Sequence, residues 1–165
     1  MTLADGKRLL DVDSDPEVMK FISNGIPTSE HDIDNIILPR LAKYLRPDKG
    51  WGIWEVCDKV SNEYLGWILV RPMHFFSPDP ELDNWELGWR FKQSTWGKGY
   101  ATESAKHIMH VLSTKHNIHL FTAIAVAENK ASLQVMKKIG MSFEKSSFHA
   151  DPLINMRMEY YRIKI

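Results

Sequence analysis

The sequence predicts one α/β domain, built on a mixed, mainly antiparallel central sheet with helices on both faces. Helix-like and strand-like segments follow in the order two helices, three strands, helix, strand, helix and two strands. With 165 residues, of which 44% are apolar and 25% are charged, the chain suits one domain with a proper core. We therefore expect a single domain over residues 1–165.

Two helices are predicted near the start of the chain. Residues 15–23 have a capping side chain at Ser14 or Asp15 and Pro16 in the first turn. Residues 29–45 carry apolar side chains at helical spacing, so a longer helix is expected there.

Three strands are predicted after these helices. Residues 51–57 and 63–70 are separated by a polar bend, and residues 84–91 form the third strand. Residues 71–83 contain three prolines and predict a long loop. Residues 7–11 are a short candidate for an additional first strand.

The second half of the chain predicts two helices, one strand and a closing antiparallel pair. These elements are expected at residues 97–115 and 129–139, at residues 118–126, and at residues 141–147 and 154–163. The second of these helices should end at Gly140, acting as a left-handed cap. Residues 148–153 are expected to join the closing pair of strands.

Charge and composition exclude several classes of function. The formal net charge is zero, so nothing favours a nucleic-acid surface or an acidic membrane. Cys57 is the single cysteine, which excludes an internal disulfide and fits a reducing compartment. No apolar run approaches the roughly 20 residues of a membrane span, and the N-terminal residues lack the apolar core of a secretory signal. We expect a soluble cytoplasmic protein with no nucleic-acid or membrane partner.

Two glycines, Gly97 and Gly99, lie between a predicted strand and a predicted helix. Glycine lets the backbone approach a ligand closely, and the N–H groups of a helix start attract phosphate. A Walker loop does not fit, because Gly99 occupies the position of its hydroxyl residue. A dinucleotide-binding turn fits poorly, because Thr102 stands where its third glycine belongs.

A second segment, residues 128–141, indicates which family of phosphate-binding turn this is. It reads Glu-Asn-Lys-Ala-Ser-Leu-Gln-Val-Met-Lys-Lys-Ile-Gly-Met. Together with Gly97 and Gly99 it resembles the GNAT superfamily of N-acetyltransferases. That family has a Gln/Arg-x-x-Gly-x-Gly/Ala turn and an Asn-x-x-Ser/Ala helix that ends in Lys-x-Gly-Phe. The similarity covers roughly residues 14–160 and is closest to the branch that includes ribosomal-protein N-acetyltransferases. Ser94 stands where the family usually has Gln or Arg.

The resemblance implies acetyl-CoA as co-substrate. Its pyrophosphate would bind at the glycine turn, and strand backbone would bind the thioester oxygen and the pantetheine amides. Asn129 would contact the pantetheine arm and also cap its helix. The residues expected to contact coenzyme A are Leu87, Trp89, Phe91, Trp96, Gly97, Lys98, Gly99, Tyr100, Ala101 and Asn129.

Two side chains are candidates for catalysis. Glu86 lies in an aromatic-rich strand, where desolvation would make it a better base, and the resemblance assigns it the proton of the amine. The alternative is a glutamate on an exposed strand face. Ser132 is the candidate proton donor to the departing thiolate, because Met136 occupies the usual tyrosine position. Alternatively, Ser132 only bonds back to the helix cap. His74 and His149 are placed in predicted loops, where they could contact the substrate.

No metal site is expected. Two histidine pairs, His107 with His110 and His116 with His119, have no adjacent carboxylate or thiol cluster. Solvated side chains explain them better than metal ligands do.

These observations predict an N-acetyltransferase that moves an acetyl group directly to a primary amine within a ternary complex. A non-catalytic acyl-CoA-binding or regulatory module on the same fold is the alternative, and a longer acyl donor is a further option. The acceptor could be a protein N-terminus, a polyamine, an amino sugar or an antibiotic. The oligomeric state is open, with a homodimer as one option.

Overall fold

The computed structural model describes residues 1–165, apart from the side chain of Ala150. The chain forms two compact units, each made of two segments. Unit 1 comprises residues Met1–Leu69 and Trp89–Tyr100, and unit 2 comprises Val70–Gly88 and Ala101–Ile165. The prediction of a single domain over the whole chain stays a prediction.

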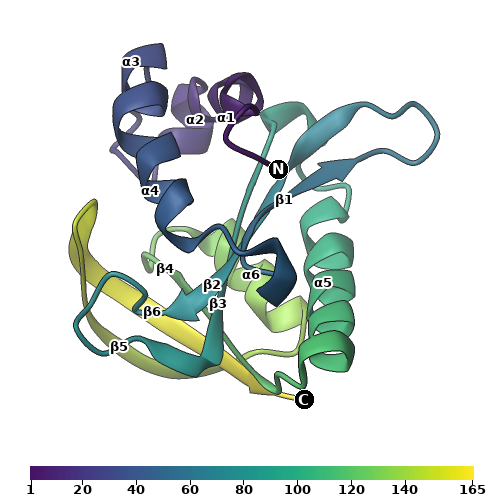
Figure 1. The fold of residues 1–165 in the computed structure, drawn as a ribbon, viewed down its shortest axis with the longest axis vertical. Helices are drawn as coiled ribbons and strands as arrows, with labels where there is room; N and C mark the ends of the chain where they lie inside the picture. The colour runs from purple at the N-terminus through teal and green to yellow at the C-terminus, as the bar shows by residue number, and fades with distance from the viewer. The chain divides into compact units, whose positions relative to one another are not determined.

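The helices and strands follow the predicted order from β1 onward (Figure 1). The helical elements are α1 Gly6–Asp13, α2 Pro16–Met19, α3 Glu30–Asp32, η1 Ile33–Ile37, α4 Leu38–Tyr44, η2 Pro47–Lys49, η3 Gln93–Thr95, α5 Tyr100–His116 and α6 Lys130–Lys138. The strands are β1 Gly52–Cys57, β2 Tyr64–Met73, β3 Glu81–Phe91, β4 Leu120–Ala125, β5 Ser142–Asp151 and β6 Ile154–Lys164.

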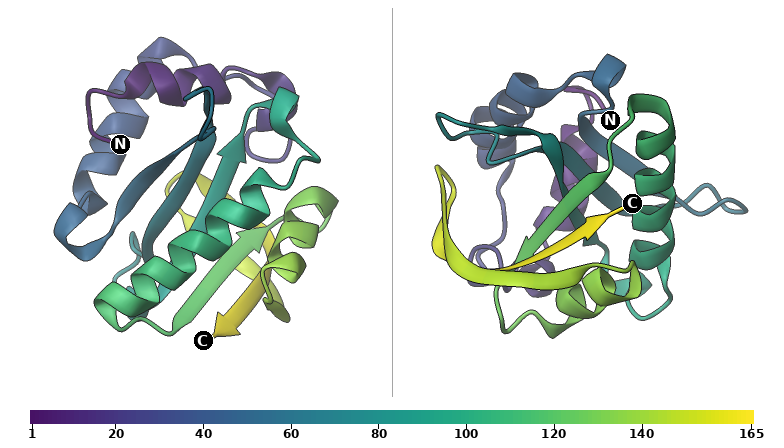
Figure 2. Two further views of the ribbon diagram at one scale, coloured as in Figure 1. Left: turned by 90° about the vertical axis from the view of Figure 1, so that its right-hand side faces the viewer. Right: turned by 90° about the horizontal axis from the view of Figure 1, so that it is seen from below.

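The described strands are hydrogen-bonded in the order β1-β2-β3-β4-β6-β5. β3 and β4 are parallel, whereas β4 and β5 are both antiparallel to β6. The neighbours β1–β2 and β2–β3 are joined by connections too short for a parallel crossover, so these pairs are antiparallel as well. The predicted mixed, mainly antiparallel sheet is confirmed. In unit 2, α5 runs beside β4 (Figure 2).

In unit 1, α1 replaces the short strand that residues 7–11 suggested. Leu9, Val12 and Asp13 are buried, which is the three- and four-residue spacing of a helix face. That periodicity overrides the short apolar run, so the strand candidate is wrong. The next helix, α2, has the predicted cap: Asp15 Oδ1 accepts the backbone N–H of Glu17 at 2.9 Å. It ends at Met19, four residues before the predicted end at Ser23.

The predicted helix over residues 29–45 exists, but its middle is a π-helical turn. Ser29 caps its start, because its hydroxyl oxygen accepts the N–H of Asp32. Within the turn, the N–H of Leu38 reaches the carbonyl of Ile33, five residues back. Pro39 follows directly and has no N–H to donate, so the wider turn accommodates it inside a helical stretch.

In unit 2, the predicted loop over residues 71–83 is mostly strand. β2 continues to Met73 and β3 begins at Glu81, so only residues 74–80 connect them. The prolines suggested a loop, but Arg71 and Met73 are buried and keep the chain extended. This correction moves Arg71 from a loop into the sheet.

The closing hairpin is also longer than predicted. β5 runs to Asp151, where Asp151 pairs with Ile154, so residues 148–153 are not the connecting segment. His149 therefore lies on a strand, opposite Met156. The expected cap at Gly140 is confirmed: its φ is 94°, and the N–H of Met141 bonds to the carbonyl of Met136.

Among the described residues, no helix combines the length and apolar character that crossing a membrane requires.

Candidate active site

The glycine turn lies directly before α5. Gly97 and Gly99 have φ values of 75° and 90°, and a Cβ added to either would meet no atom within 4 Å. The left-handed backbone explains why glycine is needed, and the open space is where a side chain would stand in the path of a ligand. α5 starts at Tyr100, three residues later than the predicted start at Gly97. The N–H groups of its first turn follow the glycines, which suits a phosphate group.

The residues on either side of the two glycines differ in exposure and in the hydrogen bonds that they make. Trp96 is 47% exposed, and its indole N–H donates to the carbonyl of Phe91 at 2.9 Å. Lys98 is exposed. The hydroxyl of Thr95 donates to the carbonyl of Lys92 at 2.7 Å. Thr95 therefore closes the short turn η3 and does not cap α5, which begins at Tyr100.

The predicted strand contacts lie at the end of β3. Leu87 and Phe91 are buried, whereas Trp89 is half-buried. Tyr100 and Ala101, at the start of α5, are half-buried. The side chains of Leu87 and Phe91 belong to the core, so any contact that they make with coenzyme A would use the backbone.

Asn129 caps α6, as predicted. Its side-chain oxygen accepts the backbone N–H of Ser132 at 3.1 Å. Both residues are half-buried, so the structure brings the two predicted positions together at one helix start. Met136, in the usual tyrosine position, is 1% exposed and has no proton to donate.

Glu86 is buried in unit 2 and forms an ion pair. Its side chain is turned into the protein, which excludes the alternative of a glutamate on an exposed strand face. Nε of Arg71 donates to Glu86 Oε2 at 2.7 Å. Nη2 of Arg71 also lies 3.8 Å from Oδ2 of Asp151. Arg71 and Asp151 were not identified from the sequence, because Arg71 fell in a predicted loop and Asp151 in a predicted turn.

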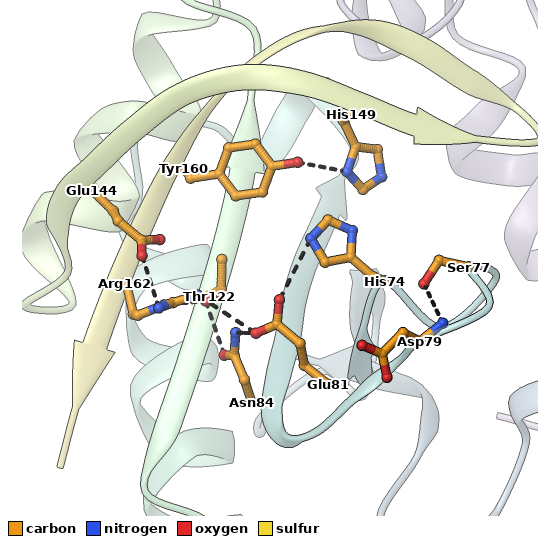
Figure 3. Close-up of polar contacts among 10 residues, drawn as sticks. All are labelled: His74, Ser77, Asp79, Glu81, Asn84, Thr122, Glu144, His149, Tyr160 and Arg162. Carbon is orange, nitrogen blue, oxygen red and sulfur yellow. Dashed lines mark hydrogen bonds and ion pairs between the residues drawn. The ribbon is translucent and has the colours of Figure 1, made fainter.

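His74 and His149, which were predicted separately as substrate contacts, meet in unit 2 (Figure 3). Their rings are stacked with centroids 5.5 Å apart. His149 is 2% exposed, and its Nδ1 lies 2.9 Å from the hydroxyl of Tyr160. His74 has a left-handed backbone with φ of 58°, and its Nε2 lies 3.6 Å from Oε1 of Glu81. A strained backbone of this kind often accompanies function.

A second chain of polar contacts crosses the strands beside these histidines (Figure 3). The amide of Asn84 donates to Glu81 Oε2 at 2.7 Å and accepts the hydroxyl proton of Thr122 at 2.9 Å. Arg162 donates to Thr122 Oγ1 at 3.2 Å and pairs with Glu144 at 2.8 Å. Except for the contact between Asn84 and Glu81, these contacts join residues far apart in the sequence, so no local pattern could have indicated them.

Burial changes the proton affinity of two groups in this cluster. Desolvation lowers the pKa of His149, opposed by the nearby carboxylates of Glu86 and Asp151. The imidazole is therefore neutral near pH 7 and can accept a proton. Desolvation, reinforced by the charge of Glu86, raises the pKa of Tyr160 to about 12, so its hydroxyl keeps its proton.

Among the described residues, no group of three or more His, Cys, Asp or Glu side chains is arranged to hold a metal ion. Of the four histidines considered for metal binding, His107, His110 and His119 are exposed. The ring of His116 lies 5.8 Å from that of Trp85.

We predict that Arg71→Met lowers the free energy of unfolding by about 3 kcal/mol, because removing one partner leaves buried carboxylates without a counter-charge. Urea denaturation measures this. Lys20→Met is the control: Lys20 forms an exposed pair with Glu17 at 3.9 Å, and its loss should cost under about 1 kcal/mol. Equal effects of the two substitutions would show that the buried pair adds nothing beyond an exposed one.

Comparison with known proteins gives the same family as the motifs. Residues 1–142 match the family model described as an acetyltransferase (GNAT) domain. The uncharacterized protein YkkB of Bacillus subtilis is 31% identical over 106 residues, 61% of this chain and 58% of that protein. The FsC-acetyl coenzyme A-N(2)-transacetylase of Aspergillus fumigatus is 26% identical over 141 residues, 84% of this chain and 58% of that protein. The chain thus spans less than two thirds of the length of these two relatives.

A solved structure extends the likeness to the three-dimensional fold. The acetyltransferase (GNAT family) from Bacillus anthracis superimposes with a TM-score of 0.76 and 25% identity, over 99% of this chain and 91% of that one. The narrower similarity to ribosomal-protein N-acetyltransferases stays a prediction. The open glycine turn before α5, the Asn129 cap, the family model and the shared fold lead to one conclusion: this chain belongs to the GNAT family of acetyltransferases.

Proposed function

We propose that the protein is an acetyl-CoA-dependent N-acetyltransferase that transfers the acetyl group directly to a primary amine in a ternary complex. The observation that carries the proposal is the turn at Gly97 and Gly99, whose space is open and which runs straight into α5. The A. fumigatus relative is named for an acetyl transfer from acetyl coenzyme A to nitrogen, which supports the same chemistry.

The chain has suitable groups to hold acetyl-CoA. The backbone N–H groups of residues 97–101 would bind the pyrophosphate, since no Cβ stands above either glycine. Lys98, which is exposed, would add a positive charge near the phosphates. Asn129 would contact the pantetheine arm with the part of its amide that the cap does not use. When bound, acetyl-CoA supplies the activated acyl group.

The remaining groups act on the amine. An ammonium has no lone pair, so it must lose a proton before it can attack the thioester. Glu86 lies in the cluster with Arg71, His149 and Tyr160, and its carboxylate favours positive charge on its neighbours. Glu86 was predicted to be the base, but Arg71 already donates to its carboxylate, so we assign it to stabilising the positive charge as the proton moves. His74 and His149 would contact the acceptor from the same cluster.

We expect Gly99→Val to abolish coenzyme A binding while the fold is kept, because a branched side chain would fill the space above the turn. Isothermal titration calorimetry with coenzyme A measures this. Circular dichroism controls for folding, and Gly25→Val, a change at another left-handed glycine in unit 1, controls for backbone strain. Unchanged affinity in Gly99→Val would remove the turn from the binding site.

Acceptor and activity are tested together by following thiol release from acetyl-CoA. The panel contains spermidine, glucosamine, kanamycin and a peptide with a free N-terminus. Acetylation of at least one of them is expected. Coenzyme A binding without thiol release from any of the four would favour a non-catalytic acyl-CoA-binding module instead.

We predict that Ser132→Ala lowers kcat by roughly 10-fold and leaves coenzyme A affinity almost unchanged. The hydroxyl would protonate the departing thiolate, and a thiol with a pKa of about 8.5 is not a very poor leaving group. Steady-state kinetics and calorimetry separate the two effects. A full kcat with weakened binding would instead make Ser132 a binding or capping residue, with protonation from solvent.

A further inference from the structure

One ring nitrogen of His149 is buried without a partner. Within the described part of the chain, Nε2 makes no hydrogen bond, although the residue is 2% exposed. Buried polar atoms in folded proteins nearly always have a partner, so an exception indicates a place for a ligand atom, a proton or water. Structural packing alone does not explain a histidine here, because an apolar side chain would avoid the unpaired atom.

The opposite ring nitrogen holds the imidazole in place. Nδ1 lies 2.9 Å from the hydroxyl of Tyr160, and the ring stacks on His74 at 5.5 Å. When Nδ1 carries the proton, it donates to the Tyr160 oxygen and leaves the lone pair on Nε2. The same hydrogen bond persists after Nε2 gains a proton, so it would stabilise the imidazolium. Tyr160 therefore suits a positioning role.

The charged groups facing His149 come from several elements of unit 2. Arg71 lies at the end of β2, Glu86 on β3 and Asp151 at the end of β5, and His74 follows β2. The two carboxylates favour a proton on His149, whereas Arg71, His74 and above all burial oppose it. The resulting pKa lies below the ordinary 6.5, so the ring is neutral and ready to accept a proton near pH 7.

Glu86 and His74, the neighbours of His149, are less suited than His149 to act as the base. Glu86 already accepts the Nε proton of Arg71 at 2.7 Å and is held in that pair. His74 is half-buried and faces Glu81 at 3.6 Å. Of these three side chains, His149 is the one that combines burial, a fixed ring and a nitrogen without a partner among the described residues.

We propose that His149 is the general base of the transfer and takes the proton of the acceptor ammonium at Nε2. This rests on the proposed function. The ammonium gives one proton to Nε2, and the free amine then forms the nitrogen–carbon bond as the carbon–sulfur bond breaks. The nitrogen loses its second proton and the thiolate gains one, so coenzyme A leaves as the thiol. His149 afterwards releases its proton to solvent.

The test compares His149→Gln with the wild-type protein. Glutamine keeps a hydrogen-bonding side chain but cannot take up a proton. The fastest acceptor of the four-amine panel is assayed with acetyl-CoA from acid to alkaline pH. We expect kcat/KM to fall roughly 100-fold at neutral pH, with a smaller loss at high pH, where free amine is plentiful. His107→Gln, at an exposed histidine of α5, is the matched control and should keep full activity.

A second readout needs neither acetyl-CoA nor an acceptor. Histidine NMR resonances are followed through a pH titration, and one resonance, absent from His149→Gln, should titrate below pH 6.5. Tyr160→Phe should shift that titration further toward acid, because the imidazolium loses its hydrogen-bond acceptor. Tyr160→Phe should also lower kcat/KM by roughly 10-fold. If His149→Gln does not fold, the pH profile of Tyr160→Phe is measured in its place.

The outcomes distinguish the proposed role of His149 as the base from the proposed acetyltransferase function. An active wild-type protein whose pH profile is unchanged in His149→Gln, or in Tyr160→Phe where the first variant does not fold, overturns the role of His149 alone. A His149 resonance that titrates at or above 6.5 also overturns it. A wild-type protein that binds coenzyme A but acetylates none of the four amines overturns the proposed function, and the base assignment with it.

Discussion

Arg71 is a buried cation in unit 2, and the arrangement around it follows from the need to balance its charge. An isolated buried charge is strongly unfavourable, so it must be paired and hydrogen-bonded. Glu86 satisfies the guanidinium at 2.7 Å, and Asp151 approaches it at 3.8 Å. Arg71 lies within the sheet, on a strand that continues past Pro72 to Met73, and Asp151 comes from the far end of β5.

Because Glu86 is paired with Arg71, neighbouring side chains have different roles in the proposed proton transfer. Glu86 provides negative charge but is committed to Arg71, whereas His149 is neutral and has an open nitrogen. Tyr160 orients His149 without competing for the proton, because its own pKa is raised to about 12. The pKa of His149 is lowered and that of Tyr160 is raised, so the two groups can take different parts in one proton transfer.

Local signals in the sequence were sufficient for the helix caps at Asp15, Asn129 and Gly140. The cap at Asn129 and the left-handed end at Gly140 depend on a few adjacent residues, and both were predicted correctly. The order of the strands and main helices along the chain from β1 onward also followed from their periodicity. The start of α5 was placed too early, because glycine is compatible with both a turn and a helix start.

What the sequence could not provide depends on contacts between distant residues. The prolines of residues 71–83 indicated a loop, whereas the burial of Met73 and the buried pair of Arg71 with Glu86 favour a continued strand. His149 was assigned to a turn because nothing near it in the sequence shows that Tyr160 lies opposite. Glu86 was correctly expected to be distinct from surface glutamates, but its partner could not be read from its own strand.

The most direct measurement of the central claim is an NMR titration of the backbone amides with coenzyme A. If the cofactor binds as argued, the largest shifts occur at Gly97, Gly99 and Tyr100, with a second set at Asn129 and Ser132. Shifts confined to other parts of the chain, with these five amides unchanged at saturation, would contradict the assignment of the glycine turn and of the acetyl-transfer function built on it.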